Sequence, residues 1–173
     1  MIKDSGNRTE FESGAVRDIQ EGKGRCDLLP LEVVANIYED MTDKTAAPYV
    51  FDWIDKFMNT GNEDLLSRAI EIFLLNDKPY DCNWSTLFLE VAVHFEEGAK
   101  KYGDRNWEKG IPVQRYIDSG LRHYLKYLRG DNDERHDRAF VWNMICAIWT
   151  CIHRPELNEY LKELESDEQS GSD

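Results

Sequence analysis

The chain of 173 residues has little positive charge: 21 Lys and Arg against 34 Asp and Glu give a formal net charge of −13. Such an acidic surface repels nucleic acid and anionic membranes, so we expect neither as a partner. A nucleotide site on this chain would need basic side chains gathered locally, or a divalent cation that bridges carboxylate and phosphate. Local clusters of Lys and Arg are therefore informative here.

The sequence also lacks a long apolar run and a close pair of cysteines. The longest apolar stretch, 139–152, contains Asn143 and is too short to span a bilayer, and the N-terminus has no apolar signal core. The four cysteines are not spaced as zinc ligands, and we expect reduced structural thiols at Cys26, Cys82, Cys146 and Cys151. These features favour a cytoplasmic protein.

Several catalytic motifs are missing. The sequence has no glycine-rich phosphate loop followed by Lys-Ser or Lys-Thr, and no Ser or Cys elbow of the hydrolase kind. His136 and Asp137 are adjacent, as in metal-dependent phosphohydrolases of the His-Asp type. His94 or His123 could supply the upstream His of that pattern, but no Asp follows on the same helix. The pattern is therefore incomplete.

What the sequence does contain is a series of amphipathic helices without a convincing strand, which predicts an all-α fold. We expect helices at about 30–41, 48–58, 62–74, 85–102, 113–128 and 133–153. The last of these is apolar nearly all round, as expected for a helix at the centre of a bundle or in an oligomer interface. The composition divides the chain into a flexible tail over 1–24, a single helical domain over 25–160 and an acidic tail over 161–173.

The helices at 85–102 and 113–128 carry charges from which a phosphate site could be built. The carboxylates that could hold a divalent cation are Glu96, Glu97 and Asp118, with Asp137 as a possible further ligand. The basic residues that could meet phosphates are Lys100, Lys101, Arg115, Arg122 and Lys126. The same spacing also allows ordinary pairing between residues four apart on a helix, such as Asp118 with Arg122.

Two further segments could contribute to a pocket. In the loop after 102, Tyr102 or Trp107 could stack on a base, and Asn106 could read its edge beside Arg105. Alternatively, Trp107 packs into the core. In the final helix, His136 and Asn143 share one stripe with apolar residues. Buried polar groups need partners, so they either bond to a neighbouring helix or form the floor of a ligand pocket.

The run from Phe95 to Pro112, FEEGAKKYGDRNWEKGIP, closely resembles the signature of a phage family, the dATP/dGTP diphosphohydrolase N-terminal domain. Residues 115–130 look like the next helix of that family, and 22–30 resemble its N-terminal motif. Its closing helix is matched by His136, Ala139, Trp142 and Asn143.

The sequence departs from the family in two ways. Residues 41–86 look like an inserted pair of helices, which could cover the pocket or make an oligomer contact. Paired Glu-x-x-Glu and Glu-x-x-Asp metal motifs are not present as such.

The family is thought to be related to the MazG-like all-α nucleoside triphosphate pyrophosphohydrolases. The resemblance therefore implies a MazG-like helical bundle in a phage-infected or lysogenic bacterial cell. It also implies a nucleotide pocket near 102–107, surrounded by Asp118, Arg122, His123, His136 and Asn143. In an enzyme of this kind, Glu97 and Asp118 would be catalytic. Mg²⁺ or Mn²⁺ would be held by Glu96, Glu97, Asp118 and Asp137.

Three functions stay open at this point. The first is metal-dependent cleavage of a purine (deoxy)nucleoside triphosphate to the monophosphate and pyrophosphate. The second is a non-catalytic sponge, an anti-defence protein that sequesters a nucleotide signal of bacterial immunity. The third is an inhibitor that docks on a host protein through the inserted helices. We also expect a homo-oligomer, because the other helices are too few to cover the final apolar helix.

Overall fold

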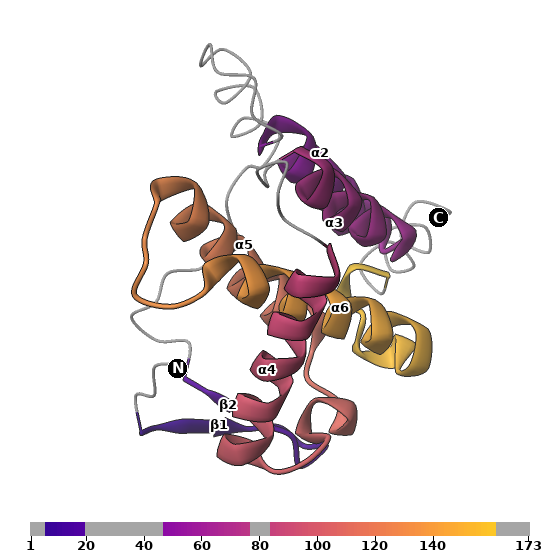
Figure 1. Ribbon diagram of the computed structural model, residues 1–173. Helices are drawn as coiled ribbons and strands as arrows, with labels where there is room; N and C mark the ends of the chain where they lie inside the picture. The colour runs from indigo at the N-terminus through magenta and orange to yellow at the C-terminus, as the bar shows by residue number, and fades with distance from the viewer. Residues whose placement is uncertain (1–5, 20–46, 77–83, 162–173) are drawn as a thin grey trace, which may run out of the picture.

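The computed structural model describes residues 6–19, 47–76 and 84–161, and these fold mainly into helices (Figure 1). The long helices are α2 (Ala47–Thr60), α3 (Asp64–Asn76), α4 (Trp84–Tyr102), α5 (Val113–Arg129) and α6 (His136–His153). Two short 3₁₀ helices follow α4 and α6, namely η2 (Asn106–Lys109) and η3 (Pro155–Leu157). The all-α prediction is confirmed. The helix expected at 30–41 lies outside the described residues, as do Cys26, Cys82 and the acidic tail beyond 161.

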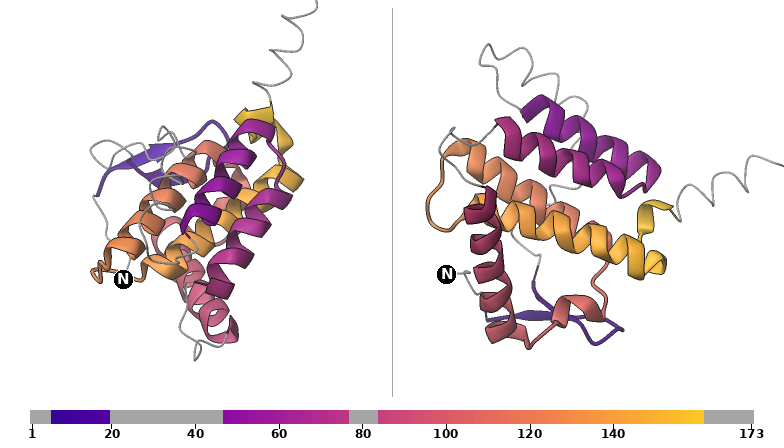
Figure 2. Two further views of the ribbon diagram at one scale, coloured as in Figure 1. Left: turned by 90° about the horizontal axis from the view of Figure 1, so that it is seen from above. Right: turned by 45° about the vertical axis from the view of Figure 1, so that its right-hand side comes forward.

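The helices are arranged around α6, which is in contact with α3, α4 and α5. The right-hand view of Figure 2 shows α5 and α6 side by side, with the α2–α3 pair packed along one side of them. Helix α4 crosses this arrangement steeply on the other side and ends near the small sheet (Figures 1 and 2). Of the two positions expected for the last helix, the centre of a bundle is the one observed, since α6 is covered by helices of its own chain.

Aromatic packing holds these layers together. Tyr124 of α5 stacks on Phe140 of α6 with ring centroids 5.0 Å apart, and Phe73 of α3 meets Phe140 edge-on at 5.0 Å. All three side chains are fully buried. Burial of such a side chain contributes about 1.5–3 kcal/mol, so this cluster accounts for a large part of the attachment of α3 to the α5–α6 pair.

The ends of the helices follow the expected chemistry. Gly61 adopts φ +65° directly after α2, a conformation that glycine tolerates best. The Asn62 side-chain oxygen then accepts a hydrogen bond from the backbone N–H of Asp64 at 3.1 Å, as a capping side chain does at the start of a helix. Helix α6 begins at His136, three residues later than predicted, because 131–135 form the connection from α5.

Residues 6–19 were expected to belong to a flexible tail, and the structure corrects this. Strands β1 (Arg8–Glu10) and β2 (Val16–Asp18) pair antiparallel in a hairpin. The side-chain amide of Asn106 fastens the hairpin in both directions: its oxygen accepts from the Val16 N–H at 3.0 Å, and its nitrogen donates to the Val16 carbonyl at 2.8 Å. The Ser13 hydroxyl donates to the Gly110 carbonyl at 2.5 Å. These partners are about ninety residues away in the chain, so local composition could not reveal them.

The described cysteines behave as structural thiols. Cys146 and Cys151 are free and buried, as predicted for small apolar side chains of α6. None of the described helices has the length and hydrophobicity that a membrane span requires.

Candidate functional site

A cavity of about 740 Å³ lies between the hairpin, α4, the η2 loop and α5, and α6 contributes to its lining. Its volume is within the usual range for small-molecule and cofactor sites. Of the residues predicted for the site, those that line it are Glu96, Lys101, Tyr102, Arg105, Asn106, Trp107, Arg115, Asp118, Arg122, His123, Lys126 and Asn143. Among the described residues, α2 and α3 contribute nothing to the lining. These two helices, which lie in the segment expected to be an insertion, therefore pack on the core, and their described residues do not cover the pocket.

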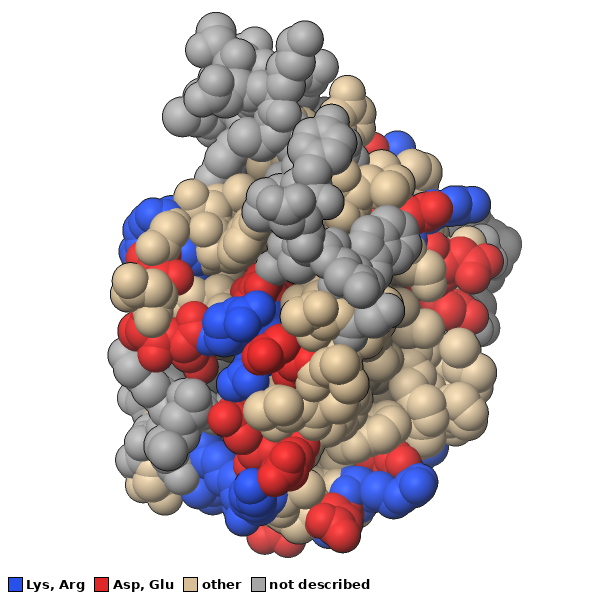
Figure 3. Space-filling view, viewed as in Figure 1, with Lys and Arg blue, Asp and Glu red and all other residues tan. Residues whose placement is uncertain are grey.

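Helix α5 supplies a basic wall, because Arg115, Arg122 and Lys126 follow one another on one face of the helix and all line the cavity. Arg122 is bonded to Asp118, which is buried. Lys126 lies 3.9 Å from an Asp133 carboxylate oxygen. Basic and acidic side chains lie next to one another over this side of the molecule (Figure 3), so the positive charge is local and partly balanced.

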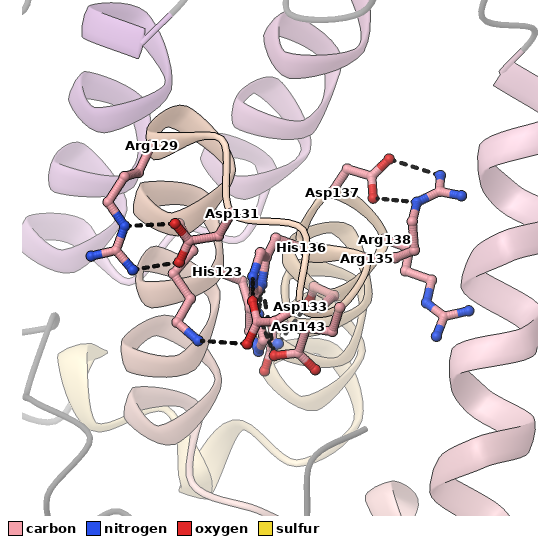
Figure 4. Close-up of polar contacts among 12 residues, drawn as sticks. His123, Arg129, Asp131, Asp133, Arg135, His136, Asp137, Arg138 and Asn143 are labelled. Atoms are coloured by element: carbon pink, nitrogen blue, oxygen red, sulfur yellow. Dashed lines mark hydrogen bonds and ion pairs between the residues drawn. The ribbon is translucent and has the colours of Figure 1, made fainter. Parts of the chain in front are cut away.

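The carboxylates predicted as metal ligands are each paired with a different basic side chain. Glu97 accepts from Arg138 at 2.8 Å, Asp137 accepts from Arg135 at 3.0 Å and 3.1 Å, and exposed Glu96 pairs with Lys100. In Figure 4, Asp137 points to Arg135 and away from His136. Lys100, Glu97, His136 and Asp137 are not part of the cavity lining. These carboxylates therefore do not form a common metal site in this arrangement.

The loop between α4 and α5 has a largely structural role. Asn106 is buried, and its amide is occupied by the Val16 backbone, so that it is not free to read a base edge. Trp107 packs between Phe95 and Trp149, with ring centroids 5.4 Å and 4.9 Å away, and still contributes to the cavity wall. Tyr102 lies beneath the Arg8 guanidinium, 5.2 Å from its ring centroid.

Arg17 of β2 is a cavity residue that the sequence did not reveal. Its Nη2 donates to the Asn143 side-chain oxygen at 2.6 Å, and its guanidinium lies 4.9 Å from the Tyr116 ring centroid. No carboxylate oxygen of the described residues lies within 4.0 Å of it, and its Nη1 is buried without a partner there. Burial lowers the pKa of this arginine. The available signal was local: apolar Phe11 and Val16 flank a Ser-Gly turn, as in a hairpin.

Two neighbours of Arg17 in the lining also carry buried nitrogen atoms without partners among the described residues, namely Trp142 Nε1 and His94 Nδ1. The Trp142 ring lies 5.9 Å from the Arg17 guanidinium and 5.2 Å from His94. Burial, together with the positive charges of Arg138 and Arg17, lowers the pKa of His94 to about 3. His94 is therefore neutral at physiological pH, whereas Arg17 Nη1 and Trp142 Nε1 are donors without partners among the described residues.

A pair of histidines lies at the α5–α6 junction. His123 Nδ1 and His136 Nδ1 are 3.0 Å apart, and the two rings are tilted by 37° with centroids 5.3 Å apart. His136 Nε2 is 2.8 Å from an Asp133 carboxylate oxygen. Burial, and next the neighbouring His136, lower the pKa of His123 well below its ordinary value. His136 was predicted to bind nucleotide, but it is not part of the cavity lining, whereas its neighbours His123 and Glu134 are.

Residues 76–160 match the family model described as dATP/dGTP diphosphohydrolase, N-terminal. The match confirms the family predicted from the sequence, and this segment, about half of the chain, belongs to it. The segment contains α4, α5 and α6 and therefore most of the cavity wall, whereas the hairpin lies outside it. No curated protein and no solved structure matches the chain.

Proposed function

We propose that the cavity binds a purine (deoxy)nucleoside triphosphate and that the protein hydrolyses it to the monophosphate and pyrophosphate, with Mg²⁺ or Mn²⁺ as cofactor. The observation that carries the proposal is the group of unpaired buried nitrogen atoms on Arg17, Trp142 and His94, next to the basic wall of α5. The description of the matched family supplies the substrate class and the reaction.

The unpaired donors favour a ligand rich in acceptor atoms. A buried polar group without a partner costs about 1–3 kcal/mol, and a buried cation without a counter-charge costs more. Phosphate and carbonyl oxygens would satisfy Arg17 Nη1 and the Trp142 N–H. A nucleotide carries both kinds of oxygen, whereas a purely apolar ligand would leave these groups unsatisfied.

The positions of the charges suggest how the nucleotide is oriented. Arg115, Arg122 and Lys126 along α5, with Lys101 at the end of α4, would hold the phosphates. The base would then lie towards the aromatic residues Tyr102 and Trp107. One guanidinium group can donate two parallel hydrogen bonds to phosphate oxygens. The arginines would therefore also fix the orientation of the phosphate chain.

Cleavage of a phosphoanhydride needs charge neutralisation on the transferring group and an activated water, which a divalent metal ion supplies in this class of reaction. The fit of the carboxylates first predicted for this role is poor, since Glu97 and Asp137 are bonded to Arg138 and Arg135. We therefore assign no step of the hydrolysis to a metal ion held by the four predicted ligands, Glu96, Glu97, Asp118 and Asp137.

The proposal is tested by incubating the purified protein with a panel of nucleotides in the presence of Mg²⁺ or Mn²⁺, and separating the products by chromatography. The protein is then heat-denatured, and any released ligand is identified. We expect dATP or dGTP to yield a monophosphate and pyrophosphate in equal amounts. Recovery of every nucleotide unchanged and unbound would overturn the proposal.

Sequestration without chemistry is a second candidate, and one observation favours it: each predicted metal-binding carboxylate already has a basic partner. Such a protein would remove a nucleotide signal from solution. The same experiment distinguishes the two functions, because a sequestered ligand is released intact on denaturation. The structure favours docking through α2 and α3 less, since their apolar faces are buried in the core.

A further inference from the structure

Three side chains at the α5–α6 junction bring possible metal-ligand atoms within 4 Å of one another. His123 Nδ1 is 3.0 Å from His136 Nδ1 and 3.6 Å from Glu134 Oε1, and the remaining separation, from His136 Nδ1 to Glu134 Oε1, is 3.7 Å. These are among the described groups that are close enough to hold a metal ion. We propose that His123, Glu134 and His136 form a binding site for one divalent transition-metal ion.

The three distances fit a metal ion. Atoms with these separations lie on a circle of radius about 2.0 Å, and metal–nitrogen and metal–oxygen bonds in zinc sites measure about 2.0–2.2 Å. An ion at the centre of the triangle would therefore be at bonding distance from all three atoms. Two histidines that merely shared a hydrogen bond would not require a carboxylate oxygen within 4 Å of both ring nitrogens.

A carboxylate outside the triangle fixes one of the imidazoles. Asp133 Oδ1 is 2.8 Å from His136 Nε2, so the Nε2 proton is held by Asp133 and the Nδ1 lone pair points to His123 (Figure 4). Histidines that bind metals commonly donate their second ring nitrogen to a carboxylate in this way. The alternative group of Asp131, Asp133 and His136 is a weaker candidate, because Asp131 is held by both Nε and Nη2 of Arg129.

The site opens towards the cavity. His123 and Glu134 line it next to Arg122 and Lys126, whereas the His136 side chain is only 1% exposed. Two imidazole nitrogens and one carboxylate oxygen suit Zn²⁺, Co²⁺, Mn²⁺ or Fe²⁺ better than Mg²⁺, which prefers oxygen ligands. Three protein ligands leave positions for water or a substrate oxygen.

The metal site stands on its own geometry, but its role in catalysis rests on the proposed function. An ion at this position would lie at the end of the basic wall where Lys126 is placed to meet phosphate. It would supply the charge neutralisation that the four paired carboxylates do not provide.

The test is a titration of the metal-stripped full-length protein with Co²⁺, followed by visible absorption, and with Zn²⁺ and Mg²⁺, followed by calorimetry, all without nucleotide. We expect one Co²⁺ or Zn²⁺ per chain and at least tenfold weaker binding of Mg²⁺. Glu134→Gln and His123→Gln should each weaken Zn²⁺ binding at least tenfold, and Asp133→Asn should weaken it about 10–100-fold. Asp131→Asn is the matched control and should leave the affinity unchanged.

Each outcome decides a separate point. The site does not exist if the wild-type protein takes up no Co²⁺ or Zn²⁺. It also does not exist if Glu134→Gln and His123→Gln, shown to be folded by circular dichroism, bind Zn²⁺ as tightly as the wild type. If the site binds metal but no nucleotide is cleaved, the metal site stands and the proposed hydrolysis fails. If nucleotide is hydrolysed with Mg²⁺ and Glu134→Gln has full activity, the hydrolysis stands and the catalytic role of this site fails.

Discussion

At the scale of single residues, the most informative group is Arg17. Arg17 is partly buried, its enclosed Nη1 has no partner, and its Nη2 has an amide oxygen as a partner but no carboxylate among the described residues. This arrangement is costly for the folded protein unless a ligand uses the guanidinium. We therefore expect Arg17→Met to leave the thermal midpoint of the ligand-free protein unchanged or raised, and to weaken nucleotide binding at least tenfold. Thermal unfolding and calorimetric titration with dGTP measure the two effects, with exposed Arg68→Met as the control. A lower midpoint with unchanged binding would mean that Arg17 is only structural.

His94 gives a prediction about pH at the same scale. Its pKa is about 3 in the folded protein and 6.5 in an unfolded chain, so between these values the unfolded chain binds a proton that the folded protein excludes. Stability is therefore lost as the pH falls below about 6.5. The loss from His94 is about 2 kcal/mol on going from pH 7.5 to pH 5.

Urea unfolding of the wild type and of His94→Gln at both pH values checks this prediction. The variant should lose less stability on acidification, by about 2 kcal/mol, whereas exposed His153→Gln should behave like the wild type. Equal losses in the wild type and in His94→Gln would show that His94 accepts a proton in the folded state.

At the scale of elements, the N-terminal hairpin depends on one side chain. Asn106 makes two hydrogen bonds to Val16, and these bonds place Arg17 in the cavity wall. Asn106→Ala should lower the free energy of unfolding by about 1–3 kcal/mol, because two backbone groups lose their partners. It should also weaken nucleotide binding and increase proteolytic cleavage near residues 8–18. Replacement of the exposed Asn59 of α2 by Ala, Asn59→Ala, is the control, and a hairpin as protected as in wild type would contradict this account.

The elements also show what a single sequence can reveal. Helices α2 to α6 were predicted because apolar spacing is a local signal, as at Val50, Phe51 and Ile54. The hairpin left only a short local signal around its Ser-Gly turn, and its attachment was missed because its partners, Asn106 and Gly110, come from a distant loop. Spacing along the sequence indicated that Glu97 could lie near the basic residues of α5. It could not show that Arg138 of α6 would donate a hydrogen bond to the Glu97 carboxylate. The approach of His123 to His136 likewise depends on how the α5–α6 connection folds.

At the scale of the whole molecule, the chain places a local group of cations and unpaired donors in one cavity, although its net charge is −13. Helix α6 is covered by helices of the same chain, so its apolar sequence no longer requires an oligomer. The homo-oligomer stays a prediction. The cavity, in contrast, is built mostly from the segment that matches a family of nucleotide hydrolases.

The central claim is that this cavity holds the phosphates of a purine nucleotide, and two adjacent lysines allow a direct test. Lys101 lines the cavity, whereas Lys100 is exposed and paired with Glu96. Calorimetric titration of dATP and dGTP should therefore give at least tenfold weaker binding to Lys101→Gln than to wild type, with Lys100→Gln unchanged. No binding of either nucleotide to wild type, or equal effects of the two substitutions, would contradict this account.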